Sequence, residues 1–223
     1  MVITHPFDIP ARNMVEIQLR RRGIHDHRVL EAMRQVPRHE FVPPQLVGAA
    51  YDDRPLPIGE RETISQPYMV AAMTQAARVA PGDIALEIGG GSGYQAAILA
   101  HLGATVWMIE INPQLADSAR QRLKRLGYGK VEVLAGDGSE GFAAPAPYDV
   151  VIVSAATPSV SPVLLGQLAE GGRLLAPVGN LYYQDLVLLS KKGGEITTYY
   201  LDQCQFVPLI GKGGWPEERG ARS

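Results

Sequence analysis

One stretch of the chain, residues 84–94, reads Ile-Ala-Leu-Glu-Ile-Gly-Gly-Gly-Ser-Gly-Tyr. Its first half is apolar, as in a strand buried on both faces, and an alanine-rich run at helical spacing follows it to His101. A short glycine loop therefore joins a strand to a helix. Because glycine has no Cβ, a ligand can approach the backbone of such a loop and meet the free N–H groups of the helix. The stretch predicts an α/β fold with a nucleotide-type ligand at this loop.

The glycines of this loop fit two cofactor patterns. Gly89, Gly91 and Gly93 form G-x-G-x-G after Glu87, which is typical of methyltransferases that use S-adenosylmethionine. Gly91, Gly93 and Ala96 also satisfy the dinucleotide pattern G-x-G-x-x-A. The loop alone does not choose between these cofactors.

Two acidic residues follow the loop at positions that suit a nucleoside. Glu110 ends a strand predicted for residues 104–109, where its carboxylate can accept hydrogen bonds from both ribose hydroxyls. Asp137 comes just after a strand predicted for residues 131–135, where it could accept from an adenine amino group, although Asp137-Gly138 is also a common turn pair. The carboxyl ends of parallel strands share one edge of the sheet, so we expect the ligand there.

Residues 1–80 are expected to form a helical and extended segment that covers the site. Apolar spacing predicts a helix over residues 12–22, which ends in three arginines. A second helix is predicted from Asp26 as its cap to just before Pro37. The high proline content of residues 41–57 predicts an extended segment laid over the domain.

Ser65 lies at or beside the start of the next helix, which runs from Pro67 to Ala77. The start of a helix carries unpaired N–H groups and a partial positive charge, which suit a carboxylate ligand. The alternative is that Ser65 only caps its helix.

Strands and helices alternate through the core, residues 81–210, and predict a Rossmann-like, doubly wound, mostly parallel seven-stranded sheet with an antiparallel edge. The core and the N-terminal helical extension are expected to form a single domain over residues 1–223. Residues 211–223 are expected to be a flexible tail. Beyond the glycine loop, the predicted elements are a helix over 113–126, a strand over 148–153, a helix over 161–169, and strands over 173–178, 185–190 and 196–207.

Composition narrows the class of protein. With 46% hydrophobic and 20% charged residues, the 223-residue chain is ordinary for one globular domain, and its net charge of -2 gives no general attraction to nucleic acid or anionic membranes. Cys204 is the only cysteine, and no signal peptide or membrane span is evident. His25 and His27 flank the cap Asp26, but the sequence suggests no set of metal ligands there, so we expect both histidines to be exposed to solvent. We expect a cytoplasmic protein, with a monomer favoured, that binds neither nucleic acid, membrane nor metal.

Motifs along nearly the whole chain resemble the protein-L-isoaspartate O-methyltransferase family. The glycine loop is shared by many methyltransferases, whereas Thr-Ile-Ser-Gln-Pro before it and Phe-Val-Pro-Leu near the end are much more specific. The blocks that carry the resemblance cover residues 18–24, 28–33, 36–43, 54–59, 63–70, 86–97, 136–139, 148–156 and 206–209.

The resemblance implies a methyltransferase core with an altered order of the last strands. It implies methyl transfer from S-adenosyl-L-methionine to the α-carboxylate of isoaspartyl residues in damaged proteins and peptides, which initiates their repair. By the same resemblance Ser65 is the active-site serine. The cofactor site is expected to comprise Glu87, Gly89, Gly90, Gly91, Ser92, Gly93, Glu110, Asp137 and Gly138, and the substrate site Thr63, Ile64, Ser65, Val207 and Pro208.

The chemistry of this reaction agrees with the residues that are present. An α-carboxylate has a pKa of roughly 3.3 to 3.7 and is already a nucleophile at neutral pH, so no base is needed to activate it. One departure from the family is Arg61-Glu62, where Gly-Gln is common, which puts two charges near the expected carboxylate site. Two rival hypotheses are an NAD-dependent oxidoreductase that uses the other register of the loop, and a non-catalytic module that only binds damaged protein.

Overall fold

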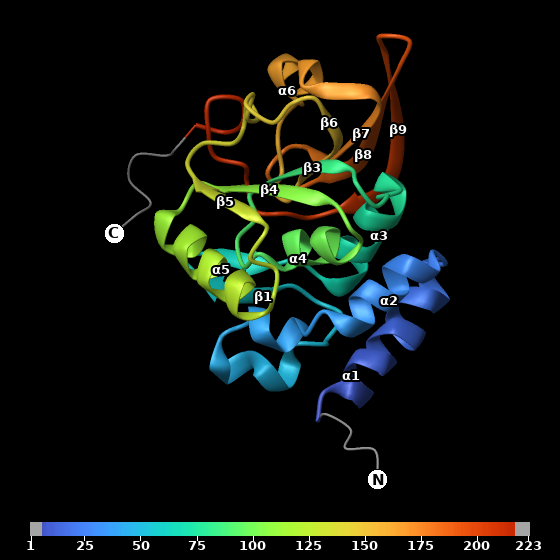
Figure 1. The fold of residues 1–223 in the computed structure, drawn as a ribbon, viewed down its shortest axis with the longest axis vertical. Coiled ribbons are helices and arrows are strands. Elements are labelled where there is room, and N and C mark those ends of the chain that lie inside the picture. Colours follow the sequence, from blue (N-terminus) through green and yellow to red (C-terminus); the bar gives the residue numbers. More distant parts are fainter. Residues whose placement is uncertain (1–5, 217–223) are drawn as a thin grey trace.

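A seven-stranded sheet forms the frame of the computed structural model, which describes residues 6–216 (Figure 1). The strand order is β5-β4-β3-β6-β7-β8-β9. Neighbours from β5 to β7 pair in parallel, whereas β8 is antiparallel to both β7 and β9, which confirms the predicted mostly parallel sheet with an antiparallel edge. The strands are β3 (Ile84–Ile88), β4 (Thr105–Glu110), β5 (Glu132–Ala135), β6 (Tyr148–Val153), β7 (Leu168–Gly179), β8 (Gln184–Lys192) and β9 (Glu195–Cys204).

The chain changes direction across the sheet at β3. It first continues to β4 and β5 on one side and then to β6 and β7 on the other. Ligands of open α/β sheets bind at the carboxyl ends of the strands beside such a switch point. At that end the N–H of Ser154, just after β6, donates to the carbonyl of Ile88 at 2.8 Å, so the residue after β6 lies beside the glycine loop.

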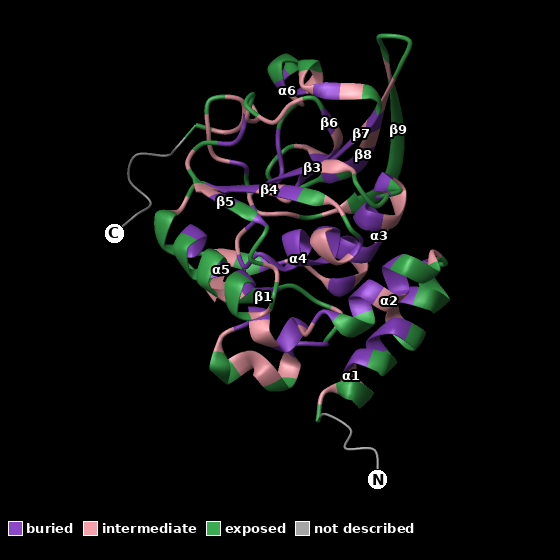
Figure 2. Ribbon diagram, viewed as in Figure 1, coloured by how far each residue is buried: buried purple, intermediate pink, exposed green. Residues whose placement is uncertain are grey.

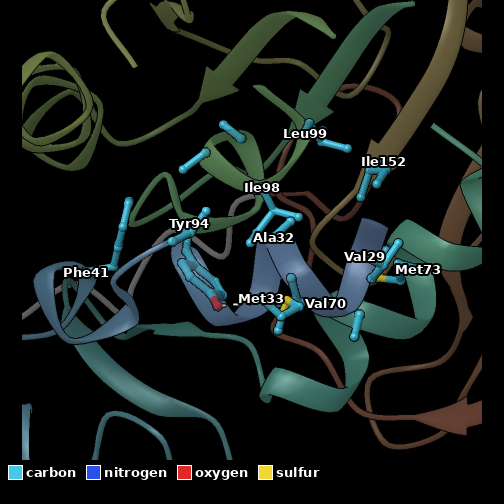
Figure 3. Close-up of a cluster of buried hydrophobic side chains, with 14 of the residues drawn as sticks. Val29, Ala32, Met33, Phe41, Val70, Met73, Tyr94, Ile98, Leu99 and Ile152 are labelled. Atoms are coloured by element: carbon cyan, nitrogen blue, oxygen red, sulfur yellow. Dashed lines mark hydrogen bonds between the residues drawn. The ribbon is translucent and has the colours of Figure 1, made fainter. Parts of the chain in front are cut away.

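Helices cover the two faces of the sheet unequally. One face packs against α2 (His27–Gln35), α3 (Pro67–Ala77), α4 (Tyr94–His101) and α5 (Pro113–Arg125), whereas short α6 (Pro162–Gly166) and loops cover the other (Figure 1). Figure 3 shows side chains of α2, α3 and α4 meeting Ile152 of β6 in the larger core. Because α3 and α4 share this core, the segment that carries Ser65 is held against the segment that carries the glycine loop.

The N-terminal segment differs in part from the prediction. Its first helix begins earlier than residue 12, with α1 (Asp8–Asn13), and continues as a π-helical and a 3₁₀ turn to Arg22. Pro10 is tolerated there because the first turn of a helix needs no N–H donor. The second helix is confirmed, since Asp26 caps it by accepting from the N–H groups of Arg28 and Val29.

Residues 41–57 were expected to be extended, and this expectation is wrong for most of them. The chain forms 3₁₀ turns at Arg38–Phe41 and Pro44–Ala49 before the hairpin of β1 (Leu56–Gly59) and β2 (Glu62–Ile64). Proline stands at the start of the second turn, where it stabilises a helical turn as readily as an extended chain.

Two boundaries near the C-terminus also differ. The helix predicted to reach residue 169 ends at Gly166, because Leu168 already pairs with Tyr148 in the sheet, and the last strand ends at Cys204. Residues 211–216, expected to be flexible, are held in part by a hydrogen bond of 2.7 Å from the N–H of Trp215 to the carbonyl of Leu209. The rest of the expected tail, residues 217–223, lies outside the described residues.

Candidate active site

The glycine loop adopts backbone conformations that glycine favours. Gly89, Gly91 and Gly93 have φ of 74°, 49° and 85°. The N–H of Gly89 donates to the carbonyl of Ile109 at 2.9 Å, which ties the loop to β4. A Cβ on Gly91 would stand 3.2 Å from Cδ1 of Ile58. The loop therefore lies directly beneath the β1–β2 hairpin.

Gly90 and Ser92 support the loop from within. A Cβ on Gly90 would collide with the side chain of Met108, so glycine allows β4 to approach closely. Ser92 is buried, and its Oγ accepts from the N–H of Tyr94 at 3.3 Å, at the start of α4. Gly90 therefore shapes the loop by allowing close packing, and Ser92 shapes it through a hydrogen bond.

Glu110 is a buried carboxylate that joins two loops at the switch point. Its Oε2 accepts from the N–H of Gly91 at 2.8 Å, and its Oε1 accepts from the N–H of Asn112 at 2.8 Å. Each carboxylate oxygen has a second lone pair, so both can still accept a ligand hydroxyl.

Glu87 is buried beneath the glycine loop. Its Oε1 accepts from Oγ of Ser154 at 3.0 Å, and its Oε2 has no partner among the described residues. Burial raises the pKa of Glu87 to about 8, and the negative charge of Glu110 adds to this shift. An unpartnered buried oxygen is costly unless a ligand satisfies it, and a cationic group would do so best.

Three adjoining cavities lie along the carboxyl ends of the strands. The Ser65 cavity, of about 430 Å³, lies between Ser65 and the end of β9, while the glycine-loop cavity and the Glu110 cavity measure about 30 and 40 Å³. Thr63 and Ser154 line all three, and Ser65 lines the first two. The three cavities therefore meet at one point.

Ser65 is not the cap of its helix. The cap of α3 is Gln66, whose side chain makes no capping hydrogen bond, and Pro67 follows as the first helical residue. The hydroxyl of Ser65 is therefore not needed to complete the helix, and Ser65 borders the point where the cavities meet.

Arg38 holds Ser65 from behind, a contact that the sequence analysis missed. Its Nη2 donates to the carbonyl of Ser65 at 2.7 Å and its Nε to that of Ala50 at 2.7 Å. The guanidinium is fully buried and lies 4.9 Å from the ring centroid of Tyr94, and its Nη1 has no partner among the described residues. Burial lowers the pKa of Arg38 to about 10, which still leaves it charged at neutral pH. A single arginine before a proline-rich segment gives no signal that could have identified this contact.

The remaining expected substrate residues gather at the same place. The segment after β9 runs parallel to the end of β6, where Ala156 donates to the carbonyl of Val207 at 2.7 Å. Val207 lines both the Ser65 and the Glu110 cavities, Pro208 the Glu110 cavity, and Ile64 the glycine-loop cavity.

Three further side chains line the Ser65 cavity, and no sequence pattern predicts a role for them. The hydroxyl of Tyr68 donates to Oδ2 of Asp202 at 3.1 Å, and the guanidinium of Arg22 lies 3.6 Å from the centre of the Tyr68 ring. They come from three separate segments, so only the fold brings them together.

Asp137 stands slightly apart from the other expected cofactor residues. Gly138 lines the Glu110 cavity, but Asp137 lines a neighbouring cavity of about 480 Å³ that shares Ile111 and Ile210 with it. The carboxylate of Asp137 accepts from the N–H groups of Ser139 at 2.9 Å and Lys212 at 2.8 Å, which lower its pKa against the effect of burial.

The described residues contain no group of three or more His, Cys, Asp or Glu side chains that could hold a metal ion. Within residues 6–216 no helix is long and apolar enough to cross a membrane.

Comparisons with known proteins give a consistent result. Residues 11–214 match the family described as Protein-L-isoaspartate(D-aspartate) O-methyltransferase. A protein-L-isoaspartate O-methyltransferase of Methanoculleus marisnigri is 54% identical over 92% of this chain and 93% of its own length. One of Koribacter versatilis is 50% identical over 96% of both chains.

Solved structures agree with the sequence comparisons. A protein-L-isoaspartate O-methyltransferase structure has a TM-score of 0.80 at 30% identity, covering 91% of this chain and 66% of that one. A putative member from Plasmodium falciparum, in complex with S-adenosyl-L-homocysteine, has a TM-score of 0.78 at 26% identity and covers 90% of this chain and 98% of that one.

Proposed function

The chain belongs to the protein-L-isoaspartate(D-aspartate) O-methyltransferase family, and we propose that the residues around Thr63 and Ser154 form its active site. The protein is an enzyme that transfers a methyl group from S-adenosyl-L-methionine to the α-carboxylate of L-isoaspartyl residues in damaged proteins and peptides, initiating their repair. The observation that carries the site assignment is that the Ser65 cavity meets the glycine-loop cavity at these two residues.

The cofactor half of the proposed site fits the donors and acceptors of S-adenosyl-L-methionine, which supplies an electrophilic methyl group on a sulfonium. The unpartnered Oε2 of Glu87 is an acceptor for the ammonium of the methionine part, and Glu110 has free lone pairs for the two ribose hydroxyls. Gly89 to Gly93 admit the ligand to the backbone, while Gly138 and then Asp137 border the adenine side.

The substrate half of the proposed site positions a nucleophile that is already ionised. Methyl transfer requires the attacking oxygen, the methyl carbon and the sulfur in line, so orientation is the main task of the protein. Ser65 is proposed to donate to the carboxylate oxygen that does not attack, because a donor on the attacking oxygen would stabilise the ground state more than the transition state. The proposed path of the peptide is lined by Thr63, Ile64, Val207 and Pro208.

Labelled S-adenosyl-L-methionine and two matched peptides test this function. We expect a base-labile labelled ester on the isoaspartyl peptide and none on its aspartyl twin. Equal labelling of both peptides would contradict the assigned specificity, and binding of the isoaspartyl peptide without labelling would favour a non-catalytic binding module.

We also propose that the enzyme acts as a cytoplasmic monomer that does not bind nucleic acid. A single cysteine and a net charge of -2 support this proposal. Sedimentation at the assay concentration and a nucleic-acid titration at low salt test it.

A further inference from the structure

The two edges of the sheet differ in how they are protected. Proteins commonly protect an exposed sheet edge with a short strand, lysine, proline or a covering element. β5, at one edge, has only 4 residues, whereas β9, at the other, has 10 and reads Glu-Ile-Thr-Thr-Tyr-Tyr-Leu-Asp-Gln-Cys without lysine, arginine, proline or glycine. Among the described strands β9 pairs with β8 alone, and almost all of its residues are exposed (Figure 2). The pairing of β9 with β8 is irregular between Tyr200 and Gln203, so the regular edge that is open to another strand runs from Glu195 to Tyr200.

Exposed aromatic side chains are concentrated near this edge. Most of the large apolar side chains that the described residues leave exposed lie in residues 181–183 and 199–201. Tyr199 and Tyr200 are neighbours in β9, so their side chains point to opposite faces of the sheet, and they are 51% and 74% exposed. Tyr182 and Tyr183, 75% and 78% exposed, lie in the turn before β8, which begins opposite Cys204.

This edge is continuous with the proposed substrate site. Asp202, Gln203 and Cys204, the last residues of β9, line the Ser65 cavity, and the rest of β9 leads away from it. A protein that carries an isoaspartyl residue in this cavity must pass its flanking chain over the neighbouring surface.

We propose that the outer edge of β9 binds the extended polypeptide that flanks the isoaspartyl residue, with Tyr199 and Tyr200 contacting that polypeptide on the two faces of the sheet. This inference rests on the proposed function and adds to it the kind of substrate that is preferred, an unfolded segment rather than a short peptide. Main-chain pairing to an edge strand gives affinity without requiring a sequence, and tyrosine offers both apolar and hydrogen-bonding contacts to varied side chains. Such recognition suits an enzyme that must act on damage in many sequence contexts.

Two isoaspartyl peptides with the same central residues test the proposal. One is short enough to occupy only the Ser65 cavity, and the other carries unstructured flanks on both sides. We expect kcat/KM of the wild-type enzyme to be about tenfold higher for the long peptide, through a lower KM. A tenfold change is what one good aromatic contact contributes to binding. The double variant Tyr199→Ser/Tyr200→Ser should lose this advantage and keep its kcat/KM on the short peptide.

Controls separate the alternatives. Ile9→Ser, which removes an exposed apolar side chain of α1 (68% exposed), should leave both peptides unchanged, and thermal unfolding should show that the double variant is folded. If the wild-type enzyme has equal kcat/KM for the two peptides, the inference about β9 is overturned while the proposed function stands. If neither peptide is methylated, the proposed function is overturned too. A dimer that the double variant abolishes would assign the edge to self-association and overturn the inference.

Backbone pairing has its own test. Two variants of the long peptide carry N-methyl groups on every second amide of the flanks, one variant on the odd and the other on the even positions. In a paired strand alternate N–H groups point to the same side, so only one of the two variants loses the donors that point toward β9. Loss of the long-peptide advantage in only one variant supports strand addition, and retention of it in both would overturn it.

Discussion

The glycine-loop half and the Ser65 half of the proposed active site are built in different ways. Residues 87–93 and Glu110 belong to two neighbouring parallel strands and the loops after them, and backbone hydrogen bonds within this unit define their positions. Ser65, Ser154 and Val207 come from segments far apart in the chain, and Ser65 is held from behind by Arg38 of yet another segment. We infer that cofactor binding depends on local backbone geometry, whereas binding and methylation of the peptide depend on the packing of the N-terminal segment.

The largest expected effect lies in the glycine-loop half. Glu110→Ala should weaken S-adenosyl-L-homocysteine binding by about two orders of magnitude or more, because each hydrogen bond to a charged group contributes roughly 1.5 to 3 kcal/mol and two are proposed to be lost. Calorimetric titration measures the effect, with Glu132→Ala, an exposed position of β5, as the control. An unchanged affinity would show that Glu110 has only a structural role.

The matching change in the other half is Ser65→Ala. It should lower kcat/KM for the isoaspartyl peptide by about one to two orders of magnitude while leaving cofactor affinity unchanged. Because Gln66 is the cap of α3, the free energy of unfolding should hardly change. Asp26→Ala is the control: it removes the cap of α2 and should destabilise the protein by about 0.5 to 2 kcal/mol without a kinetic effect.

Proton linkage tests whether Glu87 belongs to the cofactor half. Its raised pKa of about 8 means that Glu87 is mostly protonated at pH 6 without a ligand. A bound ammonium favours the carboxylate, so cofactor binding should release a proton, and affinity should rise by about tenfold or more from pH 6 to 8. Glu87→Gln should abolish both effects. Calorimetric titration at pH 6 and 8 measures the affinity, and titration in buffers of different ionisation enthalpy measures the proton release.

The chemical step should show no such pH dependence. With cofactor and peptide saturating, the single-turnover rate should be nearly flat between about pH 6 and 8, because the reference pKa of the nucleophilic carboxylate lies far below this range. A bell-shaped profile would reveal a titrating residue that takes part in the chemical step.

Arg38→Lys tests the long-range support of Ser65. Lysine cannot reach two carbonyls with the fork of a guanidinium, so we expect about a tenfold loss in kcat/KM with cofactor affinity unchanged, because a small misplacement of a positioning group is costly. Arg28→Lys is the control outside the site, since Arg28 also donates to two carbonyls, those of Val79 and Leu102, each at 2.8 Å. Arg28 is exposed whereas Arg38 is buried, so the free energy of unfolding of both variants is measured alongside kcat/KM. Equal kinetic losses in both variants would mean that Arg38 acts only through global stability.

A small change in stability alone is expected in the hairpin above the glycine loop. Arg61, at the position where the family commonly has glycine, has a φ of 62° in the β1–β2 turn. Both Arg61→Gly and Arg61→Ala remove the side-chain interaction of Arg61, so they are compared with each other: Arg61→Gly should have a free energy of unfolding about 0.5 to 1 kcal/mol higher, because a left-handed conformation strains residues that carry a Cβ. Arg61→Ala keeps the Cβ, and a denaturant titration of both variants measures the difference.

The sequence by itself determined the sheet and predicted the residues of the proposed cofactor half of the site. Buried apolar strands, their alternation with helices, and the glycine loop are local patterns, so residues 84–94 and Glu110 could be interpreted from their neighbours alone. The resemblance to the family added Ser65 and Val207 to the proposed site, although no local pattern required either to be there.

Only the tertiary structure decided how the substrate half is held together. The contact of Arg38 with Ser65, the cluster of Arg22, Tyr68 and Asp202, and the approach of Val207 to the end of β6 join segments up to 180 residues apart. Proline-rich residues 41–57 form 3₁₀ turns and the start of a hairpin, one of several conformations that proline permits, with Leu46 and Val47 partly buried against the core. Long-range packing of this kind leaves no periodic signal in the chain, so its outcome appears only when the segments are placed together in space.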